Sequence, residues 1–385
     1  MTFSDQLLNR ATAGLVAVII GFSSSIALIY QVVITLGGTP DLVASWLLML
    51  GLVMGITTIG LSYYYKVPVL IAWSTTGAAL LISSAQGYHL GEAIGAFMFA
   101  ATLVFVSGVT GWFEKIMNRI PSELACAMLA GVLVNFGIDV FNFMNELPLV
   151  IGLMVLMYFL GKRFFARFAM LSVLVAGVLL EWQMGHIDTG AIHWKISEFA
   201  YIAPVFNLQA CISIGLPLYI VTMTSQNLPG IAVLKAHNYK APISATLNVT
   251  GFINILTAPF GTYSINLAAI TAAICMSDEA DKSPDKRYWA SIAAGVFYIV
   301  MALCAATLVG LVASLPQALI LALAGIALFG TIANSLQQAL SSAQYTEAAI
   351  VTFLVTASDL TMLSVGSAFW GIIAGVCTLM ITRKS

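Results

Sequence analysis

Charged residues are scarce in this 385-residue sequence, because Asp, Glu, Lys and Arg make up only 8% of it and 60% is hydrophobic. A soluble domain carries about 25% charged residues. A chain so poor in charge cannot cover its surface with groups that water solvates, so most of that surface must face lipid. The net charge of −1 also leaves no basic surface, which excludes nucleic acid as a partner.

Cysteine and histidine are also few, and neither is arranged for chemistry. The five cysteines lie in apolar stretches without a Cys-x-x-Cys pair, and the four histidines lie in polar connections. The sequence shows no nucleophile–base pair, metal-ligand cluster, Gly-rich phosphate loop or nucleotide-binding motif. We therefore expect no enzyme, no ATP-driven pump, no cofactor and no metal.

Long apolar runs are abundant instead. A spanning helix needs about 20 apolar residues, and this criterion predicts an all-α polytopic membrane protein with fourteen spans. The spans are 11–36, 42–65, 68–85, 91–113, 122–142, 148–162, 166–184, 207–234, 242–258, 260–276, 287–313, 317–340, 346–358 and 361–381. A longer polar connection, 185–206, separates the first seven from the last seven.

The distribution of lysine and arginine supports this topology. With the N-terminus in the cytoplasm, every Lys and Arg except Lys195 falls on the cytoplasmic side. Removing one span would invert every charge that follows it. We therefore expect a multi-pass protein of a bacterial inner membrane, with both termini in the cytoplasm.

Two short segments share an unusual order of residues. The first, Lys66–Leu81, runs from Pro68 through an extended apolar stretch to Trp-Ser-Thr-Thr at 73–76 and a small-residue helix start. The second, Pro259–Ile270, repeats the order of proline, extended stretch, aromatic, hydroxyl and small residues. Matching interrupted segments in two halves of a membrane protein indicate a transport site.

These segments are the third and tenth predicted spans, so they occupy the same place in each set of seven. The fifth and twelfth spans also resemble each other, because each begins after a proline, Pro121 in one and Pro316 in the other. Because seven is odd, the second set lies upside down relative to the first. The sequence thus predicts two inverted repeats, 1–184 and 207–385, joined by a periplasmic connection at 185–206.

Four motifs carry a family resemblance: 66–80, 222–230, 264–275 and 366–371. Together they resemble the benzoate:proton symporter (BenE-type) family, which is related to the seven-plus-seven inverted-repeat uracil and sulfate carriers. The resemblance implies a core domain of spans 1–4 and 8–11, a gate domain of spans 5–7 and 12–14, and a ligand between spans 3 and 10. It also implies uptake of benzoate or a similar aromatic monocarboxylate with protons by alternating access. Related folds favour a homodimer formed through the gate halves.

The anion-binding chemistry must work without cationic side chains. No lysine or arginine lies in the middle of a predicted span, where it would cost about 2.5–3.5 kcal/mol. Each helix N-terminus carries about half a positive charge and free N–H groups, so the starts of the two broken spans together match one carboxylate. Candidate hydrogen-bonding groups at these starts are Ser74, Thr75, Thr76, Ser264 and Asn266.

The aromatic part of such a ligand needs apolar walls, for which the candidates are Trp73, Phe260 and Tyr263. Ordinary core or lipid-facing packing is the alternative for each. The first and eighth spans carry polar residues that are costly in hydrocarbon unless they face the interior, although helix–helix packing is the alternative for the serines. The residues expected to contact the ligand or gate are Ser24, Ser25, Tyr30, Gln31, Gln226 and Asn227.

The proton route is the least determined feature. Most carboxylates fall in tails, connections or first helix turns, and only Asp139 lies deeper, near the outer end of the fifth span. Uracil-type relatives tend to hold acidic and histidine residues where this sequence has Gln226 and Asn227, so their proton site does not carry over. Coupling is expected either through Asp139 or through the substrate's own carboxylate, protonated on entering a dry cavity.

Other functions within this class remain open. A nucleobase carrier is disfavoured because no intramembrane acid lies near the proposed site, and an inorganic-anion carrier is disfavoured by the aromatic walls. An anion channel is disfavoured by the inverted repeat, which favours alternating access. The leading hypothesis is a secondary active transporter that imports an aromatic monocarboxylate with protons.

Overall fold

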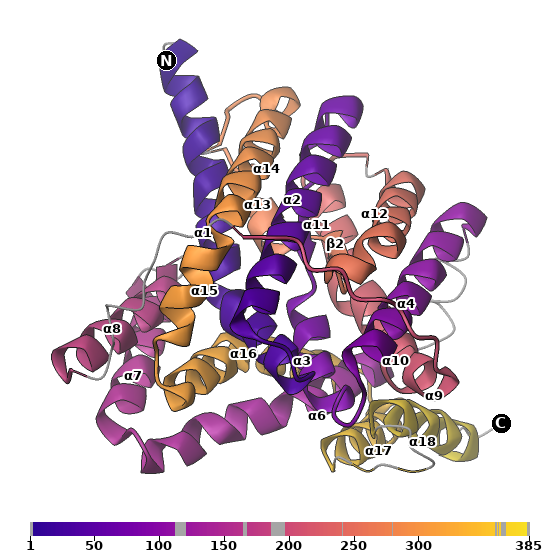
Figure 1. Cartoon of the computed structure of the whole chain (residues 1–385). Helices are drawn as coiled ribbons and strands as arrows, with labels where there is room; N and C mark the ends of the chain where they lie inside the picture. Colours follow the sequence, from indigo (N-terminus) through magenta and orange to yellow (C-terminus); the bar gives the residue numbers. More distant parts are fainter. Residues whose placement is uncertain are drawn as a thin grey trace.

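The fold is described from a computed structural model, which is almost entirely helical (Figure 1). The residues that it describes are 3–111, 121–164, 168–185, 197–240, 242–278, 280–358, 360, 362 and 367–382.

The first half of the chain follows the first seven predicted spans in order. Its elements are α1 (Phe3–Thr35), α2 (Pro40–Tyr65), β1 (Ile71–Trp73), α3 (Thr75–Ser84), α4 (Leu90–Thr110), α6 (Ser122–Asn142), η1 (Phe143–Asn145), α7 (Pro148–Phe164) and α8 (Ala169–Gln183). The start of α2 illustrates how helix boundaries follow from the sequence. Thr39 caps the helix, and Pro40 occupies its first turn.

The second half repeats this order, starting with a span that is helical throughout but contains two π-helical segments, η4 and η5. That span consists of α9 (Leu208–Ala210), η4 (Cys211–Gly215), α10 (Leu216–Thr222), η5 (Met223–Asn227) and α11 (Leu228–Ala236). The remaining elements are α12 (Ile243–Thr257), η6 (Ala258–Phe260), β2 (Ile265–Leu267), α13 (Ile270–Cys275), η7 (Pro284–Lys286), α14 (Tyr288–Leu303), α15 (Ala305–Ala313), α16 (Gln317–Ala339), α17 (Thr346–Ala357) and α18 (Ser367–Thr382).

Not every span is a single full-length helix. Within the described ranges, seven helices are long and apolar enough to cross a membrane alone. The α14–α15 pair, bent by 64°, makes an eighth if it is counted as one span. The third and tenth spans instead combine a three-residue strand with a half-length helix. The prediction that these two spans are broken is confirmed.

Helix packing has the pattern of a duplicated, inverted chain. α2 packs against α14, and its counterpart α12 packs against α4; α1 packs against α13, and α10 against α3. Glycines allow these helix pairs to approach closely: a Cβ on Gly55 would lie 2.6 Å from the carbonyl oxygen of Gly295, and one on Gly251 would lie 2.6 Å from the amide of Phe105.

The helices also fall into two packed groups. One contains α1–α4 with α9–α15, and the other contains α6–α8 with α16–α18. α1 contacts α8 and α16 as well, so it lies where the groups meet. In Figure 1, α7 and α8 lie at one side of the molecule, and α17 and α18 lie below α10. The residue bounds given above for the repeats and for the core and gate domains stay predictions.

Candidate substrate site at the paired broken spans

The two broken spans meet in the structure, because β1 and β2 form a two-stranded antiparallel ribbon. The paired residues are Ile71 with Leu267, Ala72 with Asn266 and Trp73 with Ile265. A strand at membrane depth is tolerated only where its backbone groups find partners. Each strand satisfies one edge through its neighbour, so the outer edge of each needs other partners.

On β1, side chains of α2 supply those partners. The backbone amide of Ile71 donates to Thr58 Oγ1 at 3.0 Å, and the hydroxyl of Ser62 donates to the carbonyl of Val69 at 2.7 Å. Both side chains are buried. These two hydroxyls therefore serve the ribbon in the way that another strand would.

On β2, two asparagines play the same part. The amide of Ile265 donates to Asn254 Oδ1 at 3.2 Å, and the amide of Leu267 donates to Asn227 Oδ1 at 3.2 Å. Asn254 belongs to α12, the counterpart of α2 in the other half. The structure thus gives Asn227, which the sequence analysis placed against the ligand or gate, a role in holding β2.

The ribbon leads directly into the start of α3. Ser74 caps this helix, and its Oγ accepts a hydrogen bond from the amide of Gly77 at 2.9 Å. The amides of Thr75 and Thr76, in the first turn, have no carbonyl one turn earlier to bond. The start of α3 is therefore a place where backbone donors and the positive end of a helix dipole are available.

The start of α13 lies at the opposite end of the ribbon. The amide of Ser74 donates to the carbonyl of Ser264 at 3.1 Å, whereas the amide of Ala268, just before α13, donates to the carbonyl of Leu70 at 2.9 Å. The helix starts are thus about four residues apart along the ladder, which is about 13 Å. The two dipoles do not converge on one point, and the α3 start is the one beside Ser264.

Hydroxyls from three spans gather at the start of α3. Thr75 Oγ1 lies 3.1 Å from Ser25 Oγ of α1, and Thr76 Oγ1 lies 2.7 Å from Ser225 Oγ of η5. Gln226 Nε2 also donates to Thr76 Oγ1 at 3.3 Å. Four residues expected in the site thus come together with Ser225, which was not among the expected residues. We refer to these five residues as the hydroxyl cluster.

The π-helical segment η5 explains why neighbouring residues all face this region. Ser225 and Gln226 both reach Thr76, and the next residue, Asn227, reaches Leu267 of β2. A π-helix has more residues per turn than an α-helix and is frequent at functional sites. The sequence gives no direct sign of a π-helix, so the neighbouring amide Gln226 is the only signal that would have pointed to Ser225.

A second polar group lies beside the cluster on β2. Ser264 Oγ lies 3.1 Å from Thr222 Oγ1 and accepts a hydrogen bond from Asn266 Nδ2 at 3.0 Å. All three side chains are buried. Ser264 and Asn266 therefore lie together, with Thr222 of α10 as an added member. They lie at β2, however, and not at the start of α13 as expected, because the extended stretch follows Ser264.

Two aromatic side chains flank the cap of α3. The ring of Trp73 meets that of Phe22 edge-on, with centroids 4.7 Å apart, and the hydroxyl of Tyr263 donates to the carbonyl of Ser74 at 3.0 Å. Trp73 and Tyr263 are both buried. In this structure both rings therefore pack in the protein interior beside the hydroxyls and the first-turn amides of α3.

Comparison with known proteins identifies the family. The family model described as "Benzoate membrane transport protein" (BenE) matches residues 4–381. This chain belongs to that family. BenE is a family of membrane transporters, not of enzymes.

Two relatives cover almost the whole chain. "Inner membrane protein YdcO" of Escherichia coli (strain K12) is 44% identical over 370 residues, which are 96% of this chain and 95% of that one. "Benzoate membrane transport protein" of Acinetobacter baylyi is 35% identical over 380 residues, which are 99% and 96% of the two chains.

A solved structure shares the fold of this BenE-family chain. The transmembrane domain of a cyanobacterium bicarbonate transporter, BicA, matches with a TM-score of 0.63 at 15% identity and covers 98% of both chains. The inverted-repeat fold class expected from the sequence is thereby confirmed. At this identity the likeness concerns the fold alone.

Some of the residues expected in the site lie elsewhere in this BenE-family chain. Phe260 packs edge-on against Phe199 and Tyr201 of the connection between the halves, with centroids 6.4 and 5.6 Å apart. It follows α12 in a 3-10 turn that ends before the ribbon, which is why it points to that connection. Tyr30 is half-buried against the core, and the side chain of Ser24 lies outside the described residues.

Gln31 and Asp139 line a cavity of about 710 Å³ at the end of α3 away from the ribbon. The cavity lies between elements of the two packed groups, α3 and α4 on one side and α6 on the other. Glu92 also lines it, and its two oxygens accept hydrogen bonds from Asn207 Nδ2 at 2.6 Å and from the amide of His89 at 3.0 Å. Among the described residues, its lining includes two carboxylates and no Lys, Arg or His.

The carboxylate of Asp139 accepts fewer hydrogen bonds than that of Glu92. It is exposed, and its Oδ1 accepts a hydrogen bond from Asn142 Nδ2 at 3.1 Å. Asp139 therefore does not belong to the hydroxyl cluster but lies in a separate, water-accessible space between the two packed groups.

Proposed function

We propose that this BenE-family chain imports benzoate or a similar aromatic monocarboxylate together with protons, by alternating access across a bacterial inner membrane. The family and the benzoate-transport relative support the substrate class, and the relative named as an inner membrane protein supports the location. The observation that carries the proposal is the hydroxyl cluster at the capped start of α3, bordered by buried aromatic rings.

Exposure within the cluster supports its use as a binding surface. Thr75, Ser225 and Gln226 keep part of their surface accessible, and so does Ala72 on β1, whereas Ser74 is fully buried. A ligand that reaches the ribbon therefore meets hydroxyls and an amide first. Ala72 is the partly accessible residue of β1, so it marks the face of the ribbon that a ligand could approach.

The energetics are sufficient for one carboxylate. Hydrogen bonds to a charged group contribute about 1.5–3 kcal/mol each, and the start of α3 adds about half a positive charge. Two or three such bonds offset a desolvation cost of several kcal/mol for a single anionic group. Trp73 and Phe22 pack edge-on behind the cap and could contact an aromatic ring only if the site opens.

For proton coupling we propose Asp139 as the residue that takes up the proton. Asp139 lines the cavity through which a carboxylate could enter, so a proton carried there lies close to the substrate's path. The alternative route is protonation of the substrate's own carboxylate as it leaves water.

The arrangement in the membrane is part of the same proposal. Both chain termini lie in the cytoplasm, because this orientation places nearly all lysines and arginines inside. The group containing the ribbon acts as the core, and the group of α6–α8 and α16–α18 acts as the gate against which it moves. Two copies associate through their gate helices.

Uptake into proteoliposomes tests the function. Labelled benzoate should accumulate when an inward proton gradient is imposed, and a protonophore should abolish the accumulation. Unlabelled bicarbonate, sulfate and uracil serve as competitors, and we expect them to compete poorly. Absence of gradient-dependent uptake of every aromatic acid tried would overturn the proposal.

A further inference from the structure

A buried ion pair lies at the far end of the tenth span, away from the hydroxyl cluster. Arg10 of α1 and Asp281 of the connection after α13 meet at 2.6 Å between Nη2 and Oδ2. Arg10 is 8% exposed and Asp281 is 6% exposed. A buried pair of this kind leaves an uncompensated charge when either partner is removed, so its loss is strongly unfavourable.

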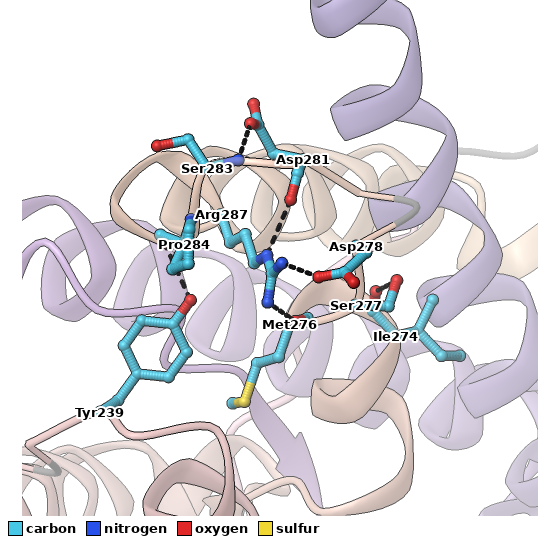
Figure 2. Close-up of polar contacts among 9 residues, drawn as sticks. All are labelled: Tyr239, Ile274, Met276, Ser277, Asp278, Asp281, Ser283, Pro284 and Arg287. Atoms are coloured by element: carbon cyan, nitrogen blue, oxygen red, sulfur yellow. Dashed lines mark hydrogen bonds and ion pairs between the residues drawn. The ribbon is translucent and has the colours of Figure 1, made fainter.

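Arg287 extends this pair to the end of α13, as Figure 2 shows. Its Nε donates to the carbonyl of Asp281 at 2.8 Å, and its Nη1 donates to the carbonyl of Met276 at 2.6 Å. It also forms an ion pair with Asp278. Met276 directly follows the last residue of α13, so the guanidinium covers the C-terminal carbonyl end of that helix. We call Arg10, Asp281 and Arg287 the clamp.

The same connection is held on its other side. The hydroxyl of Tyr239 donates to the carbonyl of Pro284 at 2.9 Å, and the amide of Ser283 donates to Asp281 Oδ1 at 2.8 Å (Figure 2). Asp281 therefore accepts hydrogen bonds or ion-pair contacts through both of its carboxylate oxygens. The connection is fixed at several points and not only at Arg10.

α13 depends on such support because it is very short. It has six residues, and its N-cap residue Ala269 makes no side-chain capping bond. Helices of this length are unstable alone, since nucleation is costly. A cation at the C-terminal end compensates the negative end of the helix dipole and satisfies a free carbonyl.

The clamp is mechanically close to the substrate site. A helix of six residues is about 9 Å long, so a shift at Met276 passes directly into β2, which follows Ser264 and carries Asn266. Arg10 lies on the same continuous helix as Ser25, which contacts Thr75. The Arg10–Asp281 pair thus fixes the axial position of α1 relative to the tenth span.

The counterpart of this connection in the first half has a different role. The segment that follows α3 includes Gln86, Gly87 and Tyr88, which line the cavity of about 710 Å³. One half-helix thus ends at the cavity between the two packed groups, and the other ends at the clamp. This asymmetry indicates that the clamp belongs to the fixed part of the site.

We propose that Arg10, Asp281 and Arg287 are positioning residues for the substrate: they hold α13 and β2 in place against α1. They do not touch the ligand. This inference rests on the proposed function for the identity of the substrate, but its structural part concerns β2 and α13 alone.

The structural part is tested without substrate, by hydrogen–deuterium exchange of the purified protein in lipid nanodiscs. In Arg10→Ala and Arg287→Ala we expect amide exchange of segment 265–276 to rise about tenfold, with the other helices unchanged. The control is Lys282→Ala, which removes an exposed positive charge from the same connection. No rise in this segment, or an equal rise in all helices, would overturn the clamp.

The functional part is tested by benzoate uptake with the same variants. We expect KM to rise about tenfold with Vmax nearly unchanged, because the site is misplaced and not removed. Raised exchange together with an unchanged KM would overturn the positioning role. If wild-type protein shows no uptake of any aromatic acid, the proposed function fails, while the exchange result still decides whether the clamp exists.

A conservative variant covers the case in which Arg10→Ala does not accumulate in the membrane. Arg10→Lys keeps the charge but loses the planar, two-point geometry of the guanidinium. A rise in exchange confined to segment 265–276 supports the clamp, and no rise or a uniform rise contradicts it.

Discussion

Tyr263 donates its hydroxyl hydrogen to the backbone carbonyl of Ser74, at 3.0 Å, although 189 residues separate the two. Tyr263 belongs to the tenth span and Ser74 caps the helix of the third. The bond therefore ties one broken span to the other at the point where the hydroxyl cluster begins. Tyr263 is 1% exposed, so the bond is made entirely within the protein.

Tyr263→Phe removes this bond while keeping the ring. The Ser74 carbonyl retains the amide of Ala78 at 2.9 Å, so we expect a loss of only about 0.5–1.5 kcal/mol in stability, visible as a lower melting temperature in detergent. Tyr298→Phe, at a tyrosine equally buried, is the matched control. Equal melting temperatures for the two variants would contradict a role for the bond.

Thr76→Val tests the hydroxyl cluster. The variant keeps a similar shape but loses the oxygen that contacts both Ser225 and Gln226. We expect KM for benzoate to rise about tenfold with a small change in Vmax. The control is Thr102→Val, an exposed threonine whose hydroxyl bonds only the carbonyl of Met98 in its own helix. Similar kinetics for both variants would show that the hydroxyl cluster is not part of the substrate site.

Asp139→Asn separates the two proton routes. If Asp139 takes up the coupled proton, an imposed inward proton gradient stimulates benzoate uptake by the wild type, and in the variant the ratio of uptake with the gradient to uptake without it falls towards one. Asp285→Asn, at an exposed aspartate of the connection that carries the clamp, is the control. Undiminished stimulation by the gradient in Asp139→Asn would assign coupling to the substrate's own carboxylate.

The stability that Asp281 contributes to the protein should depend on pH. Burial raises the pKa of its carboxyl, but the hydrogen bond from the Ser283 amide and the Arg10 guanidinium outweigh burial, so the net pKa lies below its usual value. A lowered pKa contributes stability that is present above the unfolded value of about 3.9 and is lost as pH falls through the folded value.

The expected result is a constant effect of Asp281 near neutrality. Asp281→Asn should lower the melting temperature by the same amount from about pH 5 to about pH 8, and the difference from wild type should shrink below about pH 4. Melting curves in detergent at several pH values measure this. A difference that grows as the pH falls would have the wrong sign for the ion pair.

The sequence by itself determined the class of protein and the place of its two unusual spans. Scarce charge and fourteen apolar runs require lipid on most of the surface. Proline followed by a short extended stretch and a capping serine cannot form one continuous helix, so the break at Ser74 was readable locally. A similar order of residue types located the second break near Ser264, but the helix start expected there is wrong: the strand follows this serine and α13 begins only at Ile270.

Only the tertiary structure decided which side chains meet. The register that sets Trp73 opposite Ile265 depends on a partner almost two hundred residues away, and no local pattern specifies it. The π-helix η5 turned Ser225 towards Thr76 and Asn227 towards β2, and the 3-10 turn after α12 placed Phe260 away from the ribbon. Side-chain direction in such segments follows from packing against distant elements, which is why composition and spacing alone do not reveal it.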